Sequence, residues 1–255
     1  MDDGSAGDAD YGAIGGAYAR FRRPEPAIAR VIEHALGPAR SVCNVGAGAG
    51  SYEPVRRRVV AVEPSATMRR QRPPALGPVV AGVAEALPFA ARSFDAAMTT
   101  FSVHQWADLE GGLAELRRVA RDQVVVLTCD PDRLVSSWLA EYAPEVLAVE
   151  AERYPSLDRL RDGLGGRAQS AVVPIPSGCA DGFNEAYFGR PEALLDRTAR
   201  RVCSAWSFVP GEVHERFEHD LRRDLADGSW DRRHGQLRSQ ADFAGSLVLV
   251  VAPGA

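Results

Sequence analysis

The sequence contains no lysine, and all 30 of its basic residues are arginines. A pyridoxal-phosphate enzyme is therefore excluded, because it needs a lysine to form its Schiff base. A P-loop NTPase is not expected either, because the phosphate-binding loop of that class ends in lysine. An arginine-rich, alanine-rich chain without lysine is typical of high-GC coding sequence, so we attach no further function to this absence.

Cysteine, long apolar runs and excess positive charge are also scarce. The four cysteines (Cys43, Cys129, Cys179 and Cys203) match neither a zinc pattern nor a small disulfide scaffold. No run approaches the roughly 20 apolar residues of a membrane span, and residues 1–20 are too acidic for a signal peptide. The net charge of −4 gives no electrostatic footprint for nucleic acid. We expect a cytoplasmic protein with no nucleic-acid or membrane partner.

Short apolar runs alternate with helical segments in the first half of the chain. Leu109 to Val119 has its leucines and valine on one helical face. Strands separated by helices predict a parallel sheet covered on both faces. The five predicted strands are Ser41–Val45, Val59–Val62, Pro78–Ala81, Phe94–Met98 and Val124–Leu127.

The pattern changes after residue 130. A helical region over 133–164 precedes a sixth strand at Ala171–Ile175, and a second helical region over 181–227 precedes a last strand at Leu247–Val251. The predicted fold is α/β: a Rossmann-like, seven-stranded, mostly parallel sheet with helices on both faces and a helical insertion or cap before the last strand. We divide the chain into a disordered stretch (1–10) and one domain (11–255), the latter comprising an N-terminal helical cover (11–40), a cofactor-binding core (41–130), a helical and cap region with the sixth strand (131–243) and the final strand (244–255).

A glycine-rich turn follows the first strand, in Val42 to Gly50. Glycines there permit a tight turn and close approach of a ligand to the backbone. Glu63 lies 19 residues beyond Asn44, at the end of the second strand, where a carboxylate can accept hydrogen bonds from both ribose hydroxyls. Loop and acid together indicate a cofactor that contains a nucleoside.

The spacing of the glycines separates two kinds of cofactor. A dinucleotide site has the pattern G-x-G-x-x-G, whereas Gly46, Gly48 and Gly50 give G-x-G-x-G. The following residues, 51–54, do not make a clean phosphate-binding start of a helix. A nucleoside that bears a carboxyl group therefore fits better than a pyrophosphate, although an NAD-dependent oxidoreductase stays an alternative.

With these features the chain resembles the class I S-adenosylmethionine-dependent methyltransferases, in particular the branch called methyltransferase type 11. The resemblance covers about residues 11–130. Two positions depart from the family pattern: Asn44 stands where Asp is frequent, and Val83 stands where an Asp often accepts from the adenine amino group. The matching stretches are Val42–Gly50, Val60–Pro64, Gly82–Phe89, and Ser93–Trp106 followed by Leu116–Val119.

The resemblance implies S-adenosylmethionine as cofactor and S-adenosylhomocysteine as product. It implies that Glu63 binds the ribose and that a Tyr followed by Arg-Pro covers the methionine end, so that Arg23 would pair with the cofactor carboxylate. The implied cofactor-binding residues are Tyr18, Arg23, Asn44, Gly46, Ala47, Gly48, Glu63, Pro64, Met68, Val83, Ala84, Glu85, Thr100 and Phe101.

Methyl transfer is an in-line displacement at a carbon that the sulfonium already activates, so positioning is the main catalytic task and no metal is implied. A base is needed only if the acceptor must lose a proton. The candidate catalytic residues are His104 and Tyr18, although His104 could instead orient its loop. The candidate acceptor pocket consists of Tyr11, His104, Trp106, Phe183, Asn184 and Tyr187.

The residues after the fourth strand bear on the acceptor. Methylases of nucleobase or amide nitrogens in this superfamily carry N-P-P-Y there, whereas this chain has Thr99-Thr100-Phe101-Ser102. A small organic acceptor, such as an aromatic secondary metabolite, is therefore expected, with O-, N- and C-methylation all open. A non-catalytic regulatory subunit that binds S-adenosyl ligands is a second alternative, kept open by Asn44 and Val83, and a homodimer stays open as the assembly.

Overall fold

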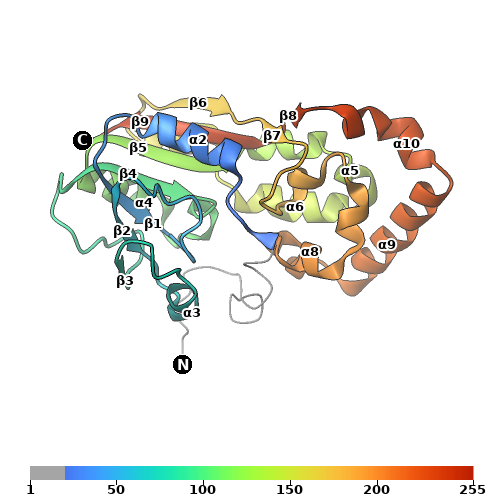
Figure 1. Ribbon diagram of the computed structural model, residues 1–255, viewed down its shortest axis with the longest axis horizontal. Helices are drawn as coiled ribbons and strands as arrows, with labels where there is room; N and C mark the ends of the chain where they lie inside the picture. The colour runs from blue at the N-terminus through green and yellow to red at the C-terminus, as the bar shows by residue number, and fades with distance from the viewer. Residues whose placement is uncertain (1–20, 255) are drawn as a thin grey trace.

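The structure is a computed structural model and describes residues 21–254. Its main sheet has the strand order β3-β2-β1-β4-β5-β9-β6 (Figure 1). All neighbouring strands are parallel except at β9, which is antiparallel to both β5 and β6. The chain order reverses between β1 and β4, and in an open sheet of this kind ligands bind beyond the carboxyl ends of the strands at that point. The strands are β1 (Ser41–Val45), β2 (Arg58–Val62), β3 (Val79–Val80), β4 (Phe94–Thr100), β5 (Ala120–Cys129), β6 (Gln169–Val172) and β9 (Leu247–Pro253).

Helices cover both faces of this sheet (Figure 1). On one face, α2 (Pro26–Ala35) packs its buried isoleucines against alternate residues of the central strands. On the other face, α4 (Leu109–Val119) and α7 (Leu157–Gly163) pack against the intervening residues. Consecutive residues of β5 therefore point into the cores on opposite faces of the sheet. Because both faces are buried, every residue of Val124–Leu127 is apolar.

The two covering helices begin at side-chain caps. Glu25 caps α2 by accepting from the Ala27 amide at 3.0 Å, and Pro26 occupies the first helical position. Asp108 caps α4 by accepting from the Gly111 amide at 3.0 Å. Each cap satisfies a backbone N–H group that has no partner within its own helix.

A helical cap lies beyond one end of the sheet, at the right of Figure 1. Its own core is rich in aromatic residues, among which Trp206, Phe217 and Trp230 are fully buried. The helices that contribute to this core are α5 (Leu139–Tyr142), α6 (Pro144–Arg153), α8 (Arg197–Arg201), α9 (Gly211–Ala226) and α10 (Ser229–His234). The short elements α3 (Ala66–Arg70), η1 (Val103–Gln105), η2 (Pro131–Ser136), η3 (Asn184–Tyr187), η4 (Pro191–Leu195), η5 (Ser204–Phe208), η6 (Gly235–Ser239), β7 (Ile175–Pro176) and β8 (Asp242–Phe243) complete the fold.

The fold class predicted from the sequence is confirmed, and the first strand and the helix at Leu109–Val119 have the predicted bounds. Two predictions differ in detail because of proline. The sixth strand ends at Val172 rather than at Ile175, since Pro174 has no N–H to continue the ladder; Ile175 pairs instead with β8. The helical region over 133–164 is divided at Pro144 and again before Pro155, which end or start helices.

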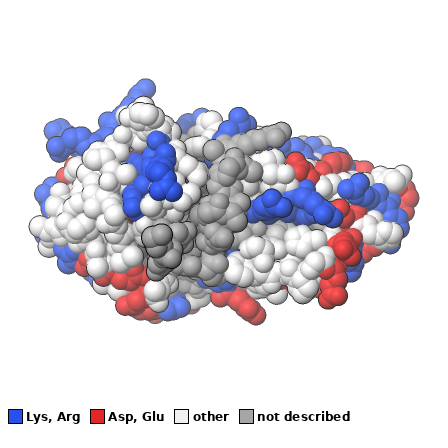
Figure 2. Space-filling model, turned by 90° about the horizontal axis from the view of Figure 1, so that it is seen from below, with Lys and Arg blue, Asp and Glu red and all other residues white. Residues whose placement is uncertain are grey.

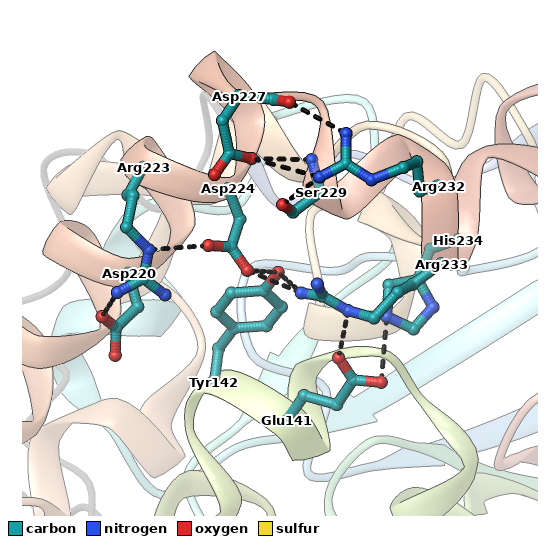
Figure 3. Close-up of polar contacts among 10 residues, drawn as sticks. All are labelled: Glu141, Tyr142, Asp220, Arg223, Asp224, Asp227, Ser229, Arg232, Arg233 and His234. Carbon is teal, nitrogen blue, oxygen red and sulfur yellow. Dashed lines mark hydrogen bonds and ion pairs between the residues drawn. The ribbon is translucent and has the colours of Figure 1, made fainter.

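A polar network fastens three helices of the cap to one another (Figure 3). The carboxylate of Asp224 on α9 accepts from the Tyr142 hydroxyl of α5 at 2.9 Å and from Arg233 of α10 at 2.6 Å. Arg223 donates to the same carboxylate at 2.9 Å, and Arg233 also donates to Glu141 at 3.0 Å. Asp224 is 6% exposed. The hydrogen bonds from Arg233 and its other partners lower the pKa of Asp224 to about 2.

The described part of the surface mixes its charges. On the face shown in Figure 2, arginine side chains are interspersed with acidic ones rather than gathered into one basic surface. Many of these arginines form ion pairs, for example Arg159 with Glu110 and Arg216 with Glu145. Over residues 21–254, no helix is both long and apolar enough to cross a bilayer.

We predict that Asp224→Asn lowers the free energy of unfolding by roughly 1–3 kcal/mol at pH 7, because three donors lose their charged acceptor. The folded-state pKa of Asp224 lies below its unfolded value of about 3.9. Its stabilising effect is thus fully present above about pH 4 and is lost as the pH falls toward 2. Unfolding in urea between pH 2 and pH 7 should show a shallower acid dependence for the variant than for the wild type.

Asp220→Asn is the matched control, since Asp220 also bonds Arg223 at 3.0 Å but forms an exposed pair within α9. We expect it to change stability by less than about 1 kcal/mol. Equal effects of the two substitutions would contradict the role assigned to the Asp224 network.

Candidate functional site

The glycine loop that follows β1 is held against β2 and against the chain beyond β4. The amides of Gly46 and Ala47 both donate to the Val62 carbonyl, at 2.9 and 3.1 Å. Gly46 has a φ of +66°, and a Cβ there would lie 1.9 Å from Oγ of Ser102. Glycine is therefore required at this position by both backbone conformation and space.

Glu63 lies at the carboxyl end of β2, beside this loop. One carboxylate oxygen accepts from the Gly48 amide and the other from the Ser65 amide, both at 2.8 Å. The residue is 6% exposed, and burial raises its pKa. Each carboxylate oxygen has more than one acceptor position, so these backbone bonds fix the side chain while leaving it able to accept from two neighbouring hydroxyl groups.

A cavity of about 810 Å³, part of it open to solvent, lies beyond the carboxyl ends of β1, β2 and β4; we call it the cofactor cavity. Ten of the residues predicted from the sequence line it: Gly46, Ala47, Gly48, Glu63, Pro64, Met68, Ala84, Thr100, Phe101 and Trp106. Trp106 was predicted for the acceptor pocket and lies here instead, donating from its indole to Ser102 at 3.0 Å. Sequence reasoning missed Arg22, Ala49, Ser51, Tyr52, Ser102, Gln105 and Asp181.

Four predicted cofactor residues lie outside the wall of this cavity: Arg23, Asn44, Val83 and Glu85. Arg23 is exposed, Val83 is 37% exposed, and Glu85 accepts from the Asp108 amide. Asn44 is fully buried beneath the loop.

The side-chain amide of Asn44 supports the glycine loop through Glu53. Its Nδ2 donates to Oε1 of Glu53 at 3.0 Å, and Arg72 binds the same carboxylate through two hydrogen bonds of 2.8 Å. This buried ion pair holds the end of the glycine loop against the segment after α3.

Asp181 joins three segments at the rim of the cofactor cavity. Its Oδ1 pairs with Nε of Arg22 at 2.5 Å, and its Oδ2 accepts from the Tyr52 hydroxyl at 2.9 Å. The carboxylate is 2% exposed, and the Arg22 guanidinium lies 5.3 Å from the centre of the Phe101 ring. Arg22, and not its neighbour Arg23, is thus the arginine that the fold brings into the site.

Two residues of this wall have strained backbones. Tyr52 has a φ of +62° and Phe101 a φ of +51°, values that non-glycine residues rarely adopt. Their ring centroids lie 6.3 Å apart, and Phe101 lies 5.6 Å from Phe183. Strain of this kind is held by surrounding contacts and is frequent at ligand sites; here it directs both rings to the cavity wall.

A second cavity adjoins the first and shares Arg22, Phe101 and Gln105 with it; its volume of about 560 Å³ includes space open to solvent. Three residues predicted for an acceptor pocket line it, namely His104, Phe183 and Asn184, whereas Tyr187 is buried outside both walls. The sequence did not indicate the rest of its wall, which is Cys129, Glu150, Tyr154, Val202, Cys203 and Ser204.

Polar and titratable groups dominate this second cavity. The His104 ring lies 4.4 Å from the Tyr154 ring, and burial raises the pKa of Tyr154 well above its ordinary value. Burial likewise raises the pKa of Cys129 and Cys203, so both thiols stay protonated near neutral pH. The described residues include no group of three or more His, Cys, Asp and Glu side chains placed to hold a metal. Tyr11 and Tyr18, also predicted for the site, lie outside the described residues.

Comparison with known proteins agrees with this geometry. Residues 43–128 match the family model described as a methyltransferase domain. A candidate methyltransferase from an antibiotic biosynthesis pathway of Anabaena variabilis is 26% identical, with 91% of this chain and 99% of that chain covered and a TM-score of 0.84. None of the curated protein sequences matches the chain.

Two more distant structures share the fold. An S-adenosylmethionine-dependent methyltransferase of Thermotoga maritima is 16% identical, covers 96% of this chain and 92% of its own, and has a TM-score of 0.53. A geranyl diphosphate C-methyltransferase of Streptomyces coelicolor is 17% identical over 90% of this chain and 80% of its own, with a TM-score of 0.51.

The strands that carry the glycine loop and Glu63 thus lie in a methyltransferase domain, and the structural match over nearly the whole chain shows the fold of the class I S-adenosylmethionine-dependent methyltransferases.

Proposed function

We propose that the protein transfers the methyl group of S-adenosylmethionine to a small, polar organic acceptor held in the second cavity, which we call the acceptor cavity from here on. The observation that carries this proposal is the contact between the two cavities, whose common wall is Arg22, Phe101 and Gln105. A methyl donor in one cavity and an acceptor in the other would be held next to each other across this common wall. Such positioning can lower the activation free energy of a reaction by roughly 7–11 kcal/mol.

The residues of the cofactor cavity fit the cofactor of this family. Glu63 presents a buried carboxylate, fixed by two amides, to a ribose diol. The backbone of Gly46 and Gly48 leaves the floor of the cavity without side chains, and Met68 adds a polarisable apolar surface. When bound, the cofactor supplies a methyl group on a sulfonium, and loss of that methyl leaves S-adenosylhomocysteine as product.

Polar side chains in the wall of the acceptor cavity can fix the orientation of a small molecule. The cap supplies Tyr154, Asn184 and Ser204, while the segment after β4 supplies Phe101 and His104. We propose that His104 accepts a proton from the nucleophile when the acceptor must lose one.

The pathway of the similar Anabaena protein supports a biosynthetic acceptor. The alternatives raised by the sequence are less well supported. An NAD-dependent oxidoreductase would need a pyrophosphate site, whereas Glu63 binds the Gly48 amide within the loop itself. A purely regulatory subunit would have no need of a polar second cavity against the first.

We predict that Glu63→Gln weakens binding of S-adenosylhomocysteine by roughly 5- to 150-fold, which corresponds to about 1–3 kcal/mol for charged hydrogen bonds lost. Titration calorimetry with S-adenosylmethionine, S-adenosylhomocysteine and NAD measures this directly.

Glu212→Gln, an exposed change of the same kind on α9, is the control and should leave the affinity unchanged. Tight binding of NAD without any binding of S-adenosyl ligands would contradict the proposal. An unchanged affinity in Glu63→Gln would contradict the ribose assignment alone.

We predict that His104→Gln lowers the turnover number by about 10²–10⁴-fold, the usual contribution of a general base. The affinity for S-adenosylhomocysteine should stay within about twofold, because His104 lines the acceptor cavity and not the cofactor cavity. Single-turnover transfer of a radiolabelled methyl group tests this. His219→Gln, at an exposed position of α9, provides the control; full turnover in His104→Gln would leave His104 only the role of orienting its loop.

A further inference from the structure

Glu150 is the acidic residue in the wall of the acceptor cavity. It lies near the end of α6, and its Oε2 accepts a hydrogen bond of 2.9 Å from Nδ2 of Asn184. The Trp206 indole donates to Oδ1 of the same amide at 3.0 Å, which fixes the direction of the Asn184 donor. Among the described residues, Asn184 is the one hydrogen-bond partner of the Glu150 carboxylate.

The buried carboxylates around the two cavities are bonded through both oxygens. Asp181 holds Arg22 and Tyr52, Glu63 holds two backbone amides, and both oxygens of Glu185 accept from Ser246. Glu150 differs, because Asn184 reaches one of its oxygens only and no ion pair joins it to an arginine of the described residues. A partly buried carboxylate with a single neutral donor is left with unsatisfied charge, which a bound cation would offset.

The charged groups that surround Glu150 leave this imbalance in place. Arg22 and Arg153 favour its ionised form from a distance, yet burial outweighs them and raises the pKa of Glu150. Arg22 is already paired with Asp181, and Arg153 donates to the Ser204 hydroxyl. Glu185 lies close enough to repel it, and the hydroxyl of Tyr154 and the thiol of Cys129 are neutral near pH 7.

We infer that the acceptor is a small amine that enters as its ammonium form, and that Glu150 is the carboxylate that recognises it. This inference rests on the proposed function and names the substrate class for it. A neutral hydroxyl acceptor would donate one hydrogen bond to Glu150, whereas an ammonium would donate a hydrogen bond and also supply the opposite charge. A carboxylate acceptor would meet repulsion there.

Methyl transfer to such an amine uses Glu150 to bind the ammonium and His104 to accept its proton. The ammonium bound by Glu150 first gives one proton to the neutral imidazole of His104. The nitrogen lone pair then forms the new N–CH₃ bond while the S–CH₃ bond breaks, and the electron pair of that bond stays on sulfur as a thioether. The product is a methylated ammonium, which Glu150 still faces, and the imidazolium returns its proton to solvent after release.

Binding of matched probes to the protein loaded with S-adenosylhomocysteine tests the inference. The probes are 2-phenylethylamine, 2-phenylethanol and phenylacetate, with propylamine, 1-propanol and propionate as a smaller series that removes size as an explanation. At pH 7 we expect each amine to bind at least tenfold more tightly than the alcohol of its series, and the carboxylates not to bind. Glu150→Gln should abolish the preference for the amine, whereas Glu152→Gln, two residues along α6 and exposed, should keep it.

The outcomes separate the inference from the function on which it rests. If S-adenosylhomocysteine does not bind, the proposed function fails. If it binds and the wild type prefers an alcohol, shows no preference, or binds no amine in either series, the inference is overturned and the proposed function stands. A preference that persists in a Glu150→Gln protein with unchanged affinity for S-adenosylhomocysteine would also overturn it.

Discussion

The carboxylate of Asp181 is the interaction on which both cavities depend. Its two oxygens hold donors from segments far apart in the chain: Arg22 from before α2 and Tyr52 from the glycine loop. The backbone strengthens the same junction, because the Gly182 amide donates to the Phe21 carbonyl at 2.7 Å. Removing Arg22 would leave the carboxylate, at 2% exposure, without its countercharge, which is far costlier than losing a surface pair.

This junction also explains how a helical cap comes to shape a cofactor site. Arg22 lines both cavities, and its guanidinium lies over Phe101, whose φ of +51° is tolerable only while neighbouring contacts hold it. Tyr52, with a φ of +62°, is held through its hydroxyl by Asp181 and by the Glu25 amide. The two strained residues and the cap segment at Asp181 therefore support one another.

The predicted residues that line the cofactor cavity are those placed by local rules. The register of β1 with β2 pairs Val45 with Val62, so the loop after one strand must lie beside the residue after the other. That is why Gly46, Gly48 and Glu63 could be assigned together from chain order alone. Arg22 and Arg23 show the opposite situation, because a choice between adjacent arginines depends on the partner that the cap supplies, Asp181.

The acceptor cavity was harder to predict for the same reason. Its wall draws on segments from Arg22 to Ser204, and no spacing in the sequence links Glu150 or Tyr154 with His104. His104 and Asn184 could be proposed because they lie beside recognisable features, the end of the fourth strand and a polar stretch of the insertion. Glu150 lies in an ordinary helical pattern, and its distinction, a carboxylate with one neutral donor, exists only after folding.

The departure at Asn44 shows how a family position can change its role without loss of the site. Nδ2 of Asn44 donates to Glu53, which Arg72 already binds through both oxygens. An Asp at this position would bring a second carboxylate to within hydrogen-bond distance of Glu53 in a buried place, where two like charges cannot both stay ionised. Asn44 is therefore compatible with the nearby carboxylate of Glu53, and the ion pair of Glu53 and Arg72 supports the end of the loop. Buried polar contacts around Glu53 and Glu63 thus hold the cofactor half of the protein together, whereas Glu150, in the cap, is the residue that we propose recognises the acceptor.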